Sequence, residues 1–513
     1  FENESFHLGV DGYFESAGTW NFSADGACRF GSHTVNFHGS RNFFAGWGPV
    51  DTSRYKTWKP KLQYIAGAGY LYQRGNLKIN LNTDYMKEEL RDKGALTLAN
   101  LYEKALDDYH FTGRWNNRLN LNYTNLDDFV VNLQAGYSFY EKRKITYLND
   151  LVNLEKSIAS DRDLHDTTIF NMISARGFVS NIPGRAFEYQ VGFDVNSETA
   201  RGKRTGGNRR LSDLSGFLNF IISPFENLRI QPGLRIMKHS DFSSPLIYGL
   251  SLDYKPAAFT FKVSYARGFR APSLKQLYLQ FIDNNHEIHG NPDLRPELAD
   301  NFSFSADYNI FHDRHMLGIE TGVFYNKIKD AVQLAISIQQ PGWGKYFNVA
   351  QRYRTRGIEA DIHYRYSPGV FVNAGISATG RLKIDDSEEY FWSTDFTASA
   401  GWTLTKQELQ LALYYKYNDA YLEFAGSYNP EGQLEGIVQQ NTSGYHMLDF
   451  TVLKKIFDNR ISFSAGIKNL LNVTQISSFG NINIHGNTAN DLSAGYGRVF
   501  FVNAAYNISK TKK

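Results

Sequence analysis

The sequence predicts a transmembrane, antiparallel, up-and-down β-barrel of about 22 strands, all-β in class. Three observations lead to this fold class. Apolar and polar residues alternate with a period of two, the connections between the predicted strands alternate between short and long, and aromatic residues are abundant, with 32 Tyr and 38 Phe in 513 residues.

The period of two runs along most of the chain. In residues 77–85, 259–266 and 409–418, apolar or aromatic side chains alternate with polar or small ones. Such alternation places the two kinds of side chain on opposite faces of a strand. Soluble β-sandwiches alternate in the same way, so the period predicts strands without choosing between these two architectures.

The connection lengths make that choice. One set of predicted turns is very short and includes residues 31–33, 74–76, 182–184, 224–226, 255–257, 367–369, 405–407 and 457–459. Most of the alternate connections are long and polar, and these include residues 86–111, 142–166, 197–211, 273–297, 327–351, 418–445 and 473–494. Short turns at one rim and long loops at the other are typical of bacterial outer-membrane barrels.

The predicted strands can be counted from Phe6–Glu15 to Arg498–Ile508. An even count returns the chain to the short-turn rim, and a closed barrel satisfies every backbone group in lipid. We therefore assign residues 1–509 to the barrel and residues 510–513 to a basic tail. A barrel of about 22 strands has a lumen too wide for side chains to fill, so we expect this chain alone to be a leaky pore.

Several function classes are disfavoured. The chain carries 55 Lys and Arg against 52 Asp and Glu, a balance of +3 that does not favour a nucleic-acid partner. Cys28 is the single cysteine, so no internal disulfide can form. No run of about 18 apolar residues predicts a membrane-spanning helix. No nucleophile–base arrangement or phosphate-binding loop has a convincing context, so we do not expect an enzyme.

Two segments resemble a known family. Residues 268–278, which include Phe269, Arg270, Ala271 and Pro272, are similar to the box that TonB-dependent receptors carry at the start of their seventh outer loop. Residues 291–297, which begin Asn291, Pro292, Asp293 and Leu294, resemble the partner box of that loop. Residues 356–360, 466–472 and 497–501 also match the family, in its order. The strand count independently makes this loop the seventh.

The resemblance implies a receptor in the bacterial outer membrane that takes up a scarce, large nutrient with energy from the TonB complex. It also implies an N-terminal plug and a TonB box. Because the chain begins at Phe1 without Met, we expect that a preceding part has been removed and that neither is in this chain. A surface lipoprotein, membrane lipid and lipopolysaccharide are further expected partners.

Haem is the favoured ligand, as a transported molecule rather than a permanently bound cofactor. Haem receptors of this family resemble this chain in having a histidine between the two boxes, where His286 and His289 lie. A neutral imidazole binds haem iron. One helical turn would put both histidines on one side, whereas an extended loop would separate them. Tyr278 and Phe281 are expected to cover a porphyrin face.

Other readings remain open at this point. The boxes are common to siderophore and cobalamin receptors, and a passive pore or an adhesion barrel belongs to a different class. His286 and His289 are ordinary polar loop residues in the simplest reading. Five basic residues in 201–210 suit either an anionic ligand or lipopolysaccharide, and Trp343, Tyr346 and Phe347 suit either an apolar partner or packing between loops. His38 is expected to point into the lumen.

Overall fold

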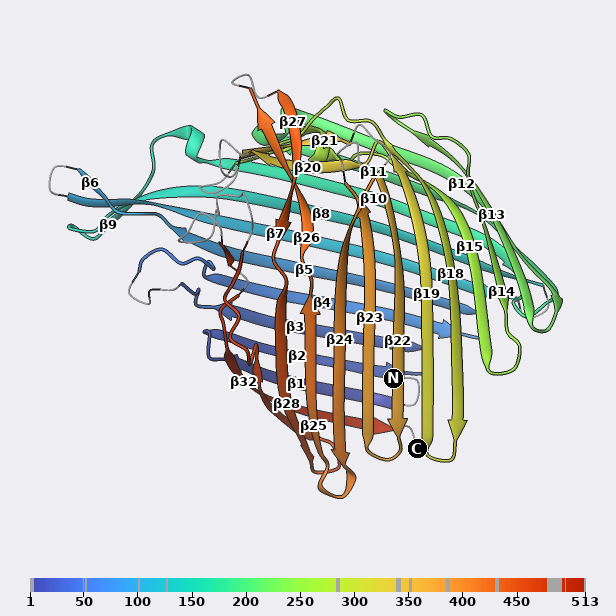
Figure 1. The fold of residues 1–513 in the computed structure, drawn as a ribbon. Coiled ribbons are helices and arrows are strands. Elements are labelled where there is room, and N and C mark those ends of the chain that lie inside the picture. The colour runs from blue at the N-terminus through green and yellow to red at the C-terminus, as the bar shows by residue number, and fades with distance from the viewer. Residues whose placement is uncertain are drawn as a thin grey trace.

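A computed structural model shows one large sheet that closes on itself as a barrel (Figure 1). The structure describes residues 4–48, 50, 53–99, 102–125, 128–282, 287–337, 343–349, 353–383, 388–429, 433–477, 491–493 and 495–511. The sheet contains 24 strands; β6 (Thr97–Ala99) and β9 (Glu155–Ile158) are short additions in the loops, and the other 22 form the wall. The predicted fold class is confirmed.

The barrel closes where the first wall strand meets the last. Strand β1 (Glu4–Glu15) pairs antiparallel with β32 (Val499–Thr511), with Leu8 opposite Ile508. The strands between them pair in chain order: β2 (Thr19–Phe30), β3 (His33–Phe44), β4 (Lys61–Arg74), β5 (Leu77–Lys93), β7 (Tyr102–Thr124), β8 (Phe129–Asp150), β10 (Asp166–Asn181), β11 (Phe187–Gly202), β12 (Gly207–Phe225), β13 (Leu228–His239), β14 (Ile247–Tyr254), β15 (Phe259–Arg270), β18 (Glu297–His312), β19 (His315–Lys329), β22 (Tyr353–Tyr366), β23 (Val370–Leu382), β24 (Tyr390–Leu404), β25 (Leu409–Asn418), β28 (Tyr445–Ile456) and β29 (Ile461–Lys468).

The long connections share one rim, which also carries the short connections 16–18 and 203–206, and the opposite rim carries only turns of five residues or fewer. Because neighbouring wall strands are antiparallel, connections that follow odd-numbered wall strands share one rim and the others share the opposite rim. The long connection 271–296 follows the thirteenth wall strand, whereas the short turn 182–186 follows the eighth. We call these ends the long-loop rim and the short-turn rim.

Several strands are longer than predicted. Residues 197–211 were predicted as a loop, but β11 and β12 leave only residues 203–206 between them. Residues 86–111 and 142–166 were also predicted as loops, but β5, β7 and β8 run far into these segments, and β7 alone has 23 residues. Strands β5, β7 and β8 project beyond the long-loop rim (Figure 1). The prediction was wrong here because both faces of this projection are largely polar, so the alternation that marks a strand inside the membrane is lost. Lys510 and Thr511, assigned to the tail, pair with β1 as part of β32.

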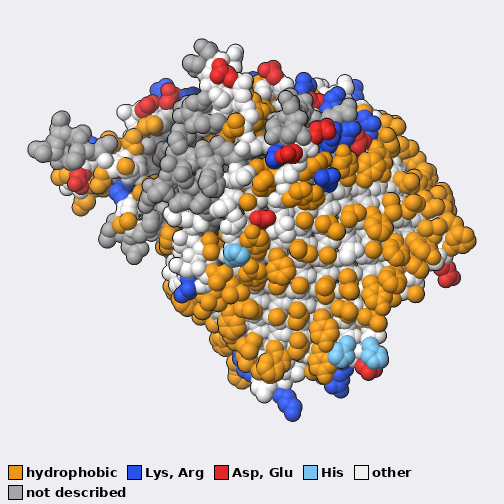
Figure 2. Space-filling model, in the orientation of Figure 1, with side chains coloured by type: hydrophobic (Ala, Val, Ile, Leu, Met, Phe, Trp, Pro, Cys, Tyr) orange, Lys and Arg blue, Asp and Glu red, His pale blue; other side chains and the backbone are white. Residues whose placement is uncertain are grey.

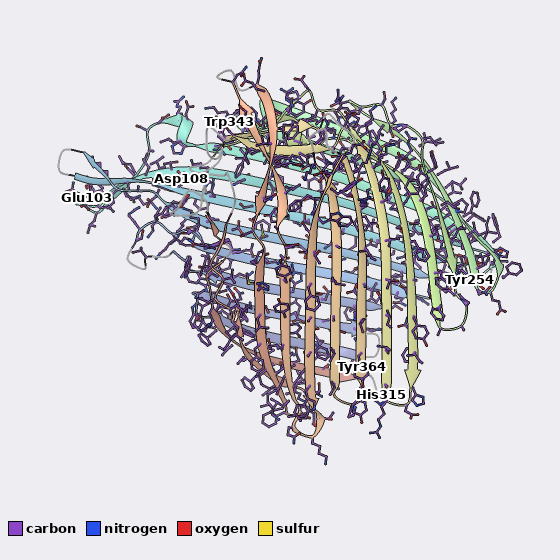
Figure 3. The ribbon with its side chains drawn as sticks, viewed as in Figure 1. Glu103, Asp108, Tyr254, His315, Trp343 and Tyr364 are labelled. Atoms are coloured by element: carbon purple, nitrogen blue, oxygen red, sulfur yellow. The ribbon has the colours of Figure 1, made fainter. Side chains whose placement is uncertain are left out.

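Buried ion pairs hold the projection to the connection between β3 and β4. Arg54 donates to both carboxylate oxygens of Asp107 at 2.6 and 2.9 Å, and the Asp107 side chain is only 4% exposed. Lys59 pairs with Asp92 at 2.5 Å. On the same projection Lys144 pairs with Asp108, whose position Figure 3 shows, at 2.8 Å.

The outer face of the wall is apolar and the inner face is polar. Val323, Ile358 and Ile376 are exposed on three neighbouring strands, β19, β22 and β23, and Figure 2 shows the apolar band to which such residues belong. Asp361 and His363 alternate with the outward residues of β22 and therefore face the lumen. His38 lies on the polar face, as expected, with its Nε2 atom 3.3 Å from a carboxylate oxygen of Asp84.

Histidine–tyrosine groups mark the edges of the apolar band. In each of three groups a histidine Nδ1 atom lies 2.7–2.8 Å from a tyrosine hydroxyl on the neighbouring strand, with a second tyrosine ring beside it. The groups are His33 with Tyr70 and Tyr72, His315 with Tyr364 and Tyr366, and His446 with Tyr415 and Tyr417. Figure 3 places His315 and Tyr364 at the short-turn rim. Rings with a polar tip suit the boundary between lipid and water.

The wide lumen leads to a prediction for the chain as printed. Refolded alone and inserted into a planar lipid bilayer, it should give stable, stepwise ion conductance, because wall side chains cannot fill a lumen of this strand number. Heat-denatured protein is the control. Inserted barrels that conduct no ions would contradict the prediction.

Candidate functional site

The seventh long loop begins and ends on an ion pair. Arg270 closes β15 and donates from Nε and Nη2 to the two carboxylate oxygens of Glu297, each at 2.6 Å. Glu297 opens β18 directly opposite Arg270, and it also accepts from the backbone N–H of Val332 at 2.6 Å. This box residue therefore ties the seventh loop to the eighth.

A short helix follows the first box. Helix α1 (Leu274–Tyr278) starts at a capping box in which the Ser273 hydroxyl accepts from the backbone N–H of Gln276, and the Gln276 side chain accepts from the N–H of Ser273. Pro272, just before it, is fully buried. The box residues Phe269 and Ala271 lie, respectively, in β15 and directly after it.

The helix packs on the inside of the wall. Leu274 and Leu277 join a buried cluster that also contains the box residue Leu294. The other buried members are Ala200 and Leu211 of the wall and Val332 of the eighth loop, with Tyr278 and Tyr346 packed against them. This cluster is the local core that fixes the seventh loop.

The second box is bonded to the eighth loop. The Asn291 side chain donates to the backbone carbonyl of Tyr346 at 2.9 Å. Arg295 pairs with Asp330 at 2.7 Å, and its backbone N–H donates to the Asn348 side chain at 2.8 Å. Pro292 and Asp293 are exposed, and the Asp293 N–H donates to the Asn291 side chain. Hydrogen bonds and an ion pair of the box segments therefore join the seventh loop to the eighth.

Three long loops share one six-stranded sheet, which we call the loop sheet. It contains β16 (Gln280–Ile282) and β17 (Glu287–His289) from the seventh loop, β21 (Trp343–Asn348) and β20 (Val332–Ser337) from the eighth, and β26 (Tyr421–Tyr428) and β27 (Leu434–Thr442) from the tenth, in that order. Figure 1 shows it at the long-loop rim. Strand pairing therefore joins the seventh loop to the eighth loop, and the eighth loop to the tenth.

His289 lies in this sheet, in extended backbone opposite Lys345 of β21. Its Nε2 atom is 3.1 Å from a carboxylate oxygen of Glu287, and its side chain is 25% exposed. Its ring lies 5.4 Å from that of Trp343, which packs edge-on against Tyr428 at 4.4 Å. The three rings form an aromatic row, and Figure 3 places Trp343 at the long-loop rim.

A hydrogen bond to the eighth loop fixes the position of Tyr428 in this row. Its hydroxyl donates to the backbone carbonyl of Ala335 at 2.9 Å. Burial raises its pKa to about 12, because a phenolate would lose its hydration. The hydroxyl therefore stays protonated at physiological pH and remains a donor.

A cationic side chain lies over the ring of each of the two predicted aromatic residues of the seventh loop. The Arg209 guanidinium lies over the Tyr278 ring at 4.5 Å, and the Lys142 ammonium lies over the Phe281 ring at 5.3 Å. Both are cation–π contacts. His286, the other predicted ligand, lies outside the described residues.

Part of this site could be predicted from the sequence. His289 and Trp343 were candidates in separate loops, but the contact between them and the contact with Tyr428 were not predicted. Tyr346 and Phe347 pack between loops, as one of the two readings held. Within the described part of the chain, no three His, Cys, Asp or Glu side chains are grouped as a metal site would need.

A family model and several relatives match the chain. The model for the β-barrel of TonB-dependent receptor-like proteins matches residues 46–470. A Haemophilus influenzae protein, named for haemoglobin and haemoglobin–haptoglobin binding, is 25% identical over 269 residues, which are 46% of this chain and 25% of that protein. The iron-regulated outer membrane virulence protein of Vibrio cholerae is 28% identical over 197 residues, 36% of this chain and 27% of that protein. The chain thus aligns with about a quarter of each.

Solved structures share the fold. The FrpB iron transporter from Neisseria meningitidis superposes with a TM-score of 0.69 at 16% identity, covering 99% of this chain and 82% of that one. The copper transporter OprC gives 0.73 at 13% identity, covering 99% and 81%. The siderophore receptor PirA from Pseudomonas aeruginosa gives 0.68 at 14% identity, covering 98% and 81%. With the family match over most of the wall, the chain belongs to the TonB-dependent receptor β-barrels of the bacterial outer membrane.

Proposed function

We propose that this chain is the barrel of a receptor that imports an iron-bearing nutrient with energy from TonB, and that the nutrient is haem. Family membership supports receptor function and TonB coupling, and it gives no reason to expect an enzyme. The name of the Haemophilus relative supports haem, and the names of the Vibrio and Neisseria proteins support iron more broadly.

The observation that carries the proposal is the aromatic row of His289, Trp343 and Tyr428 at the long-loop rim. A carboxylate at Nε2 favours the tautomer with a proton on that nitrogen, which leaves a lone pair on Nδ1. A carboxylate that is hydrogen-bonded to one ring nitrogen also fixes the orientation of the imidazole, as in many metal sites. Binding through Nε2 instead would require the Glu287 contact to open. Flat aromatic rings beside the histidine suit a porphyrin.

The loop sheet sets how such a ligand would be enclosed. Because β17 is bonded to β21, and β20 to β26, closure of the seventh loop would carry the eighth and tenth loops with it. Release from the closed state would then depend on the energy that TonB supplies. No covalent step is required.

A siderophore is the second candidate, and the cation–π pairs favour it. Arg209 on Tyr278 and Lys142 on Phe281 combine positive charge with an aromatic face. An aromatic face beside each cation suits an anionic aromatic iron chelate, whereas haem propionates need the positive charge alone.

Substitution of His289 tests the haem proposal. In the full-length receptor, His289→Ala should shift the Soret band of bound haem and weaken haem binding at least about tenfold, since changes that only support a metal ligand already cost that much. Growth on haem as the sole iron source should fall. His446→Ala, in the wall, is the matched control and should change neither readout.

Two outcomes would redirect the proposal. An unchanged Soret band and unchanged growth in both His289→Ala and the double variant with His286→Ala would make these histidines loop residues only. If Arg209→Gln then abolished uptake of a ferric catecholate but not of haem, the siderophore reading would replace haem.

A further inference from the structure

The loop sheet ends on a strand with one open edge. Strand β27 pairs with β26, and no other strand that the structure describes pairs with it. The wall strands, by contrast, all have two neighbours, because β1 and β32 close the ring. Main-chain N–H and C=O groups of alternate β27 residues therefore point away from β26. Figure 1 shows β27 at the long-loop rim, beyond the ends of the wall strands.

Strand β27 is long for an open edge. It has nine residues, whereas β6, β9 and β16, which also pair on one side only among the described strands, have three or four. Proteins keep exposed edges short or block them with proline or lysine, since an open edge pairs with other chains. Residues 434–442 contain no Pro, Lys or Arg. The side chains of this strand therefore leave its edge available for pairing.

Apolar packing holds β27 on the sheet. Leu434 and Ile437 pack against the buried cluster that contains Phe347 of the eighth loop. This contact orders the strand from one face and leaves its outer edge uncovered by the cluster. An edge that is already ordered costs less conformational entropy when a partner binds, which favours affinity.

The other face of β27 favours particular side chains in a partner. Val438 is 45% exposed. A Cβ atom at Gly436, two residues away on the same face, would meet no atom within 4 Å, so open space lies beside it. An aromatic ring from a neighbouring strand can cover such an edge glycine. Glu435 is exposed and favours a lysine or arginine on the added strand.

We propose that β27 accepts one strand from a second protein, so that the loop sheet gains a seventh strand. The occupant is an extended segment with an aromatic residue beside Gly436 and a basic residue beside Glu435. Main-chain hydrogen bonds give the affinity of such strand addition, and the side chains give the specificity. Only an extended backbone matches the spacing of donors and acceptors along the edge. This docking goes beyond nutrient binding and does not require haem.

A second copy of this strand is a poorer occupant. Residues 434–442 contain no aromatic and no basic residue, so β27 paired with β27 would leave Gly436 uncovered and place two acidic residues on one short ribbon. Like charges close together on neighbouring strands are destabilising. The sequence of β27 therefore favours a different chain as the partner.

Peptide binding to the full-length receptor in detergent tests this proposal. The probe is a synthetic peptide of alternating valine and threonine, with one central phenylalanine and one lysine beside it. At saturating peptide, alternate amides of residues 434–442 should exchange hydrogen at least about tenfold more slowly, because each gains a main-chain acceptor. The same peptide N-methylated at alternate residues should bind at least about tenfold more weakly, because it loses several donors.

A charge swap identifies the edge that binds. Glu435→Lys should weaken binding of the lysine peptide about threefold or more, and a peptide with glutamate in place of lysine should then bind more tightly than it binds the unaltered receptor. Glu103→Lys is the matched control, because Glu103 is an exposed acid on the projection, beside the open strand β6 (Figure 3). It should leave both affinities unchanged.

Four results would overturn the proposal. Equal effects of Glu435→Lys and Glu103→Lys would show that the peptide responds to charge alone. Absence of protection in residues 434–442 at saturating peptide would place binding elsewhere. Slow exchange of all these amides without peptide would show that the edge is already covered. Receptor dimers that Glu435→Lys dissociates would identify a second copy as the occupant.

Discussion

Asp107→Ala should release the connection between β3 and β4 from the projecting strands while leaving the wall intact. The substitution removes both hydrogen bonds from Arg54 and one from the backbone N–H of Gly94. It leaves a guanidinium whose side chain is 21% exposed without its carboxylate. Breaking a buried pair on one side destabilises by about 3–5 kcal/mol. Amide hydrogen exchange in residues 53–58 and 92–108 should therefore accelerate strongly.

The matched control is Asp163→Ala, which removes the exposed partner of Lys203. Solvent screens that pair, so exchange should not change measurably. If the amides of residues 92–108 exchanged equally slowly in the Asp107→Ala variant and in the unaltered chain, backbone pairing alone would hold the projection.

Leu277→Ala should loosen the seventh loop from its seat on the wall. Leu277 is 1% exposed in the cluster that includes Leu274, Leu294 and Val332. Truncation of a buried leucine costs about 2–5 kcal/mol through lost burial and the cavity left behind. Trypsin should then cut more rapidly after Lys275, and ligand affinity should fall because the loop sheet is anchored through this cluster.

Leu154→Ala provides the comparison, because Leu154 is 87% exposed in the fourth loop. It should alter neither cleavage nor affinity. If trypsin cleaved the Leu277→Ala variant no faster than the Leu154→Ala variant, the Arg270–Glu297 pair and the box hydrogen bonds would be sufficient to fix the seventh loop on the wall.

The wall could be predicted from the sequence because a membrane imposes one rule on every strand. Residues facing lipid must be apolar, so alternation persists through β5, β15 and β25, and the loop lengths then assign the rims. The projecting parts of β7 and β8 were not predicted as strands. Water contacts both of their faces, so polar residues occupy both faces and the alternation is lost. There the strands are held by cross-strand and ion-pair contacts, such as Arg54 with Asp107, that join residues distant in sequence.

The site was predictable only in parts. The boxes were found by resemblance, and His289 by its place between them. The loop sheet was not predicted, because strands as short as β17, with three residues, leave no periodic pattern. Their order is set by pairing between segments more than fifty residues apart, such as Glu287 with Trp343. A single sequence does not reveal which loops will meet.

The closed ring of the wall also restricts how such a chain can change over generations. Each strand holds its register against two neighbours, and β1 and β32 join the two ends of the series. Loss of one residue within β12 would turn Leu214 toward the lumen and the residues beside it toward lipid. The mismatch could not be absorbed at a free edge, because the ring has none. Changes in length are therefore tolerated in the loops, where new ligands are met, while the wall changes by substitution at constant length.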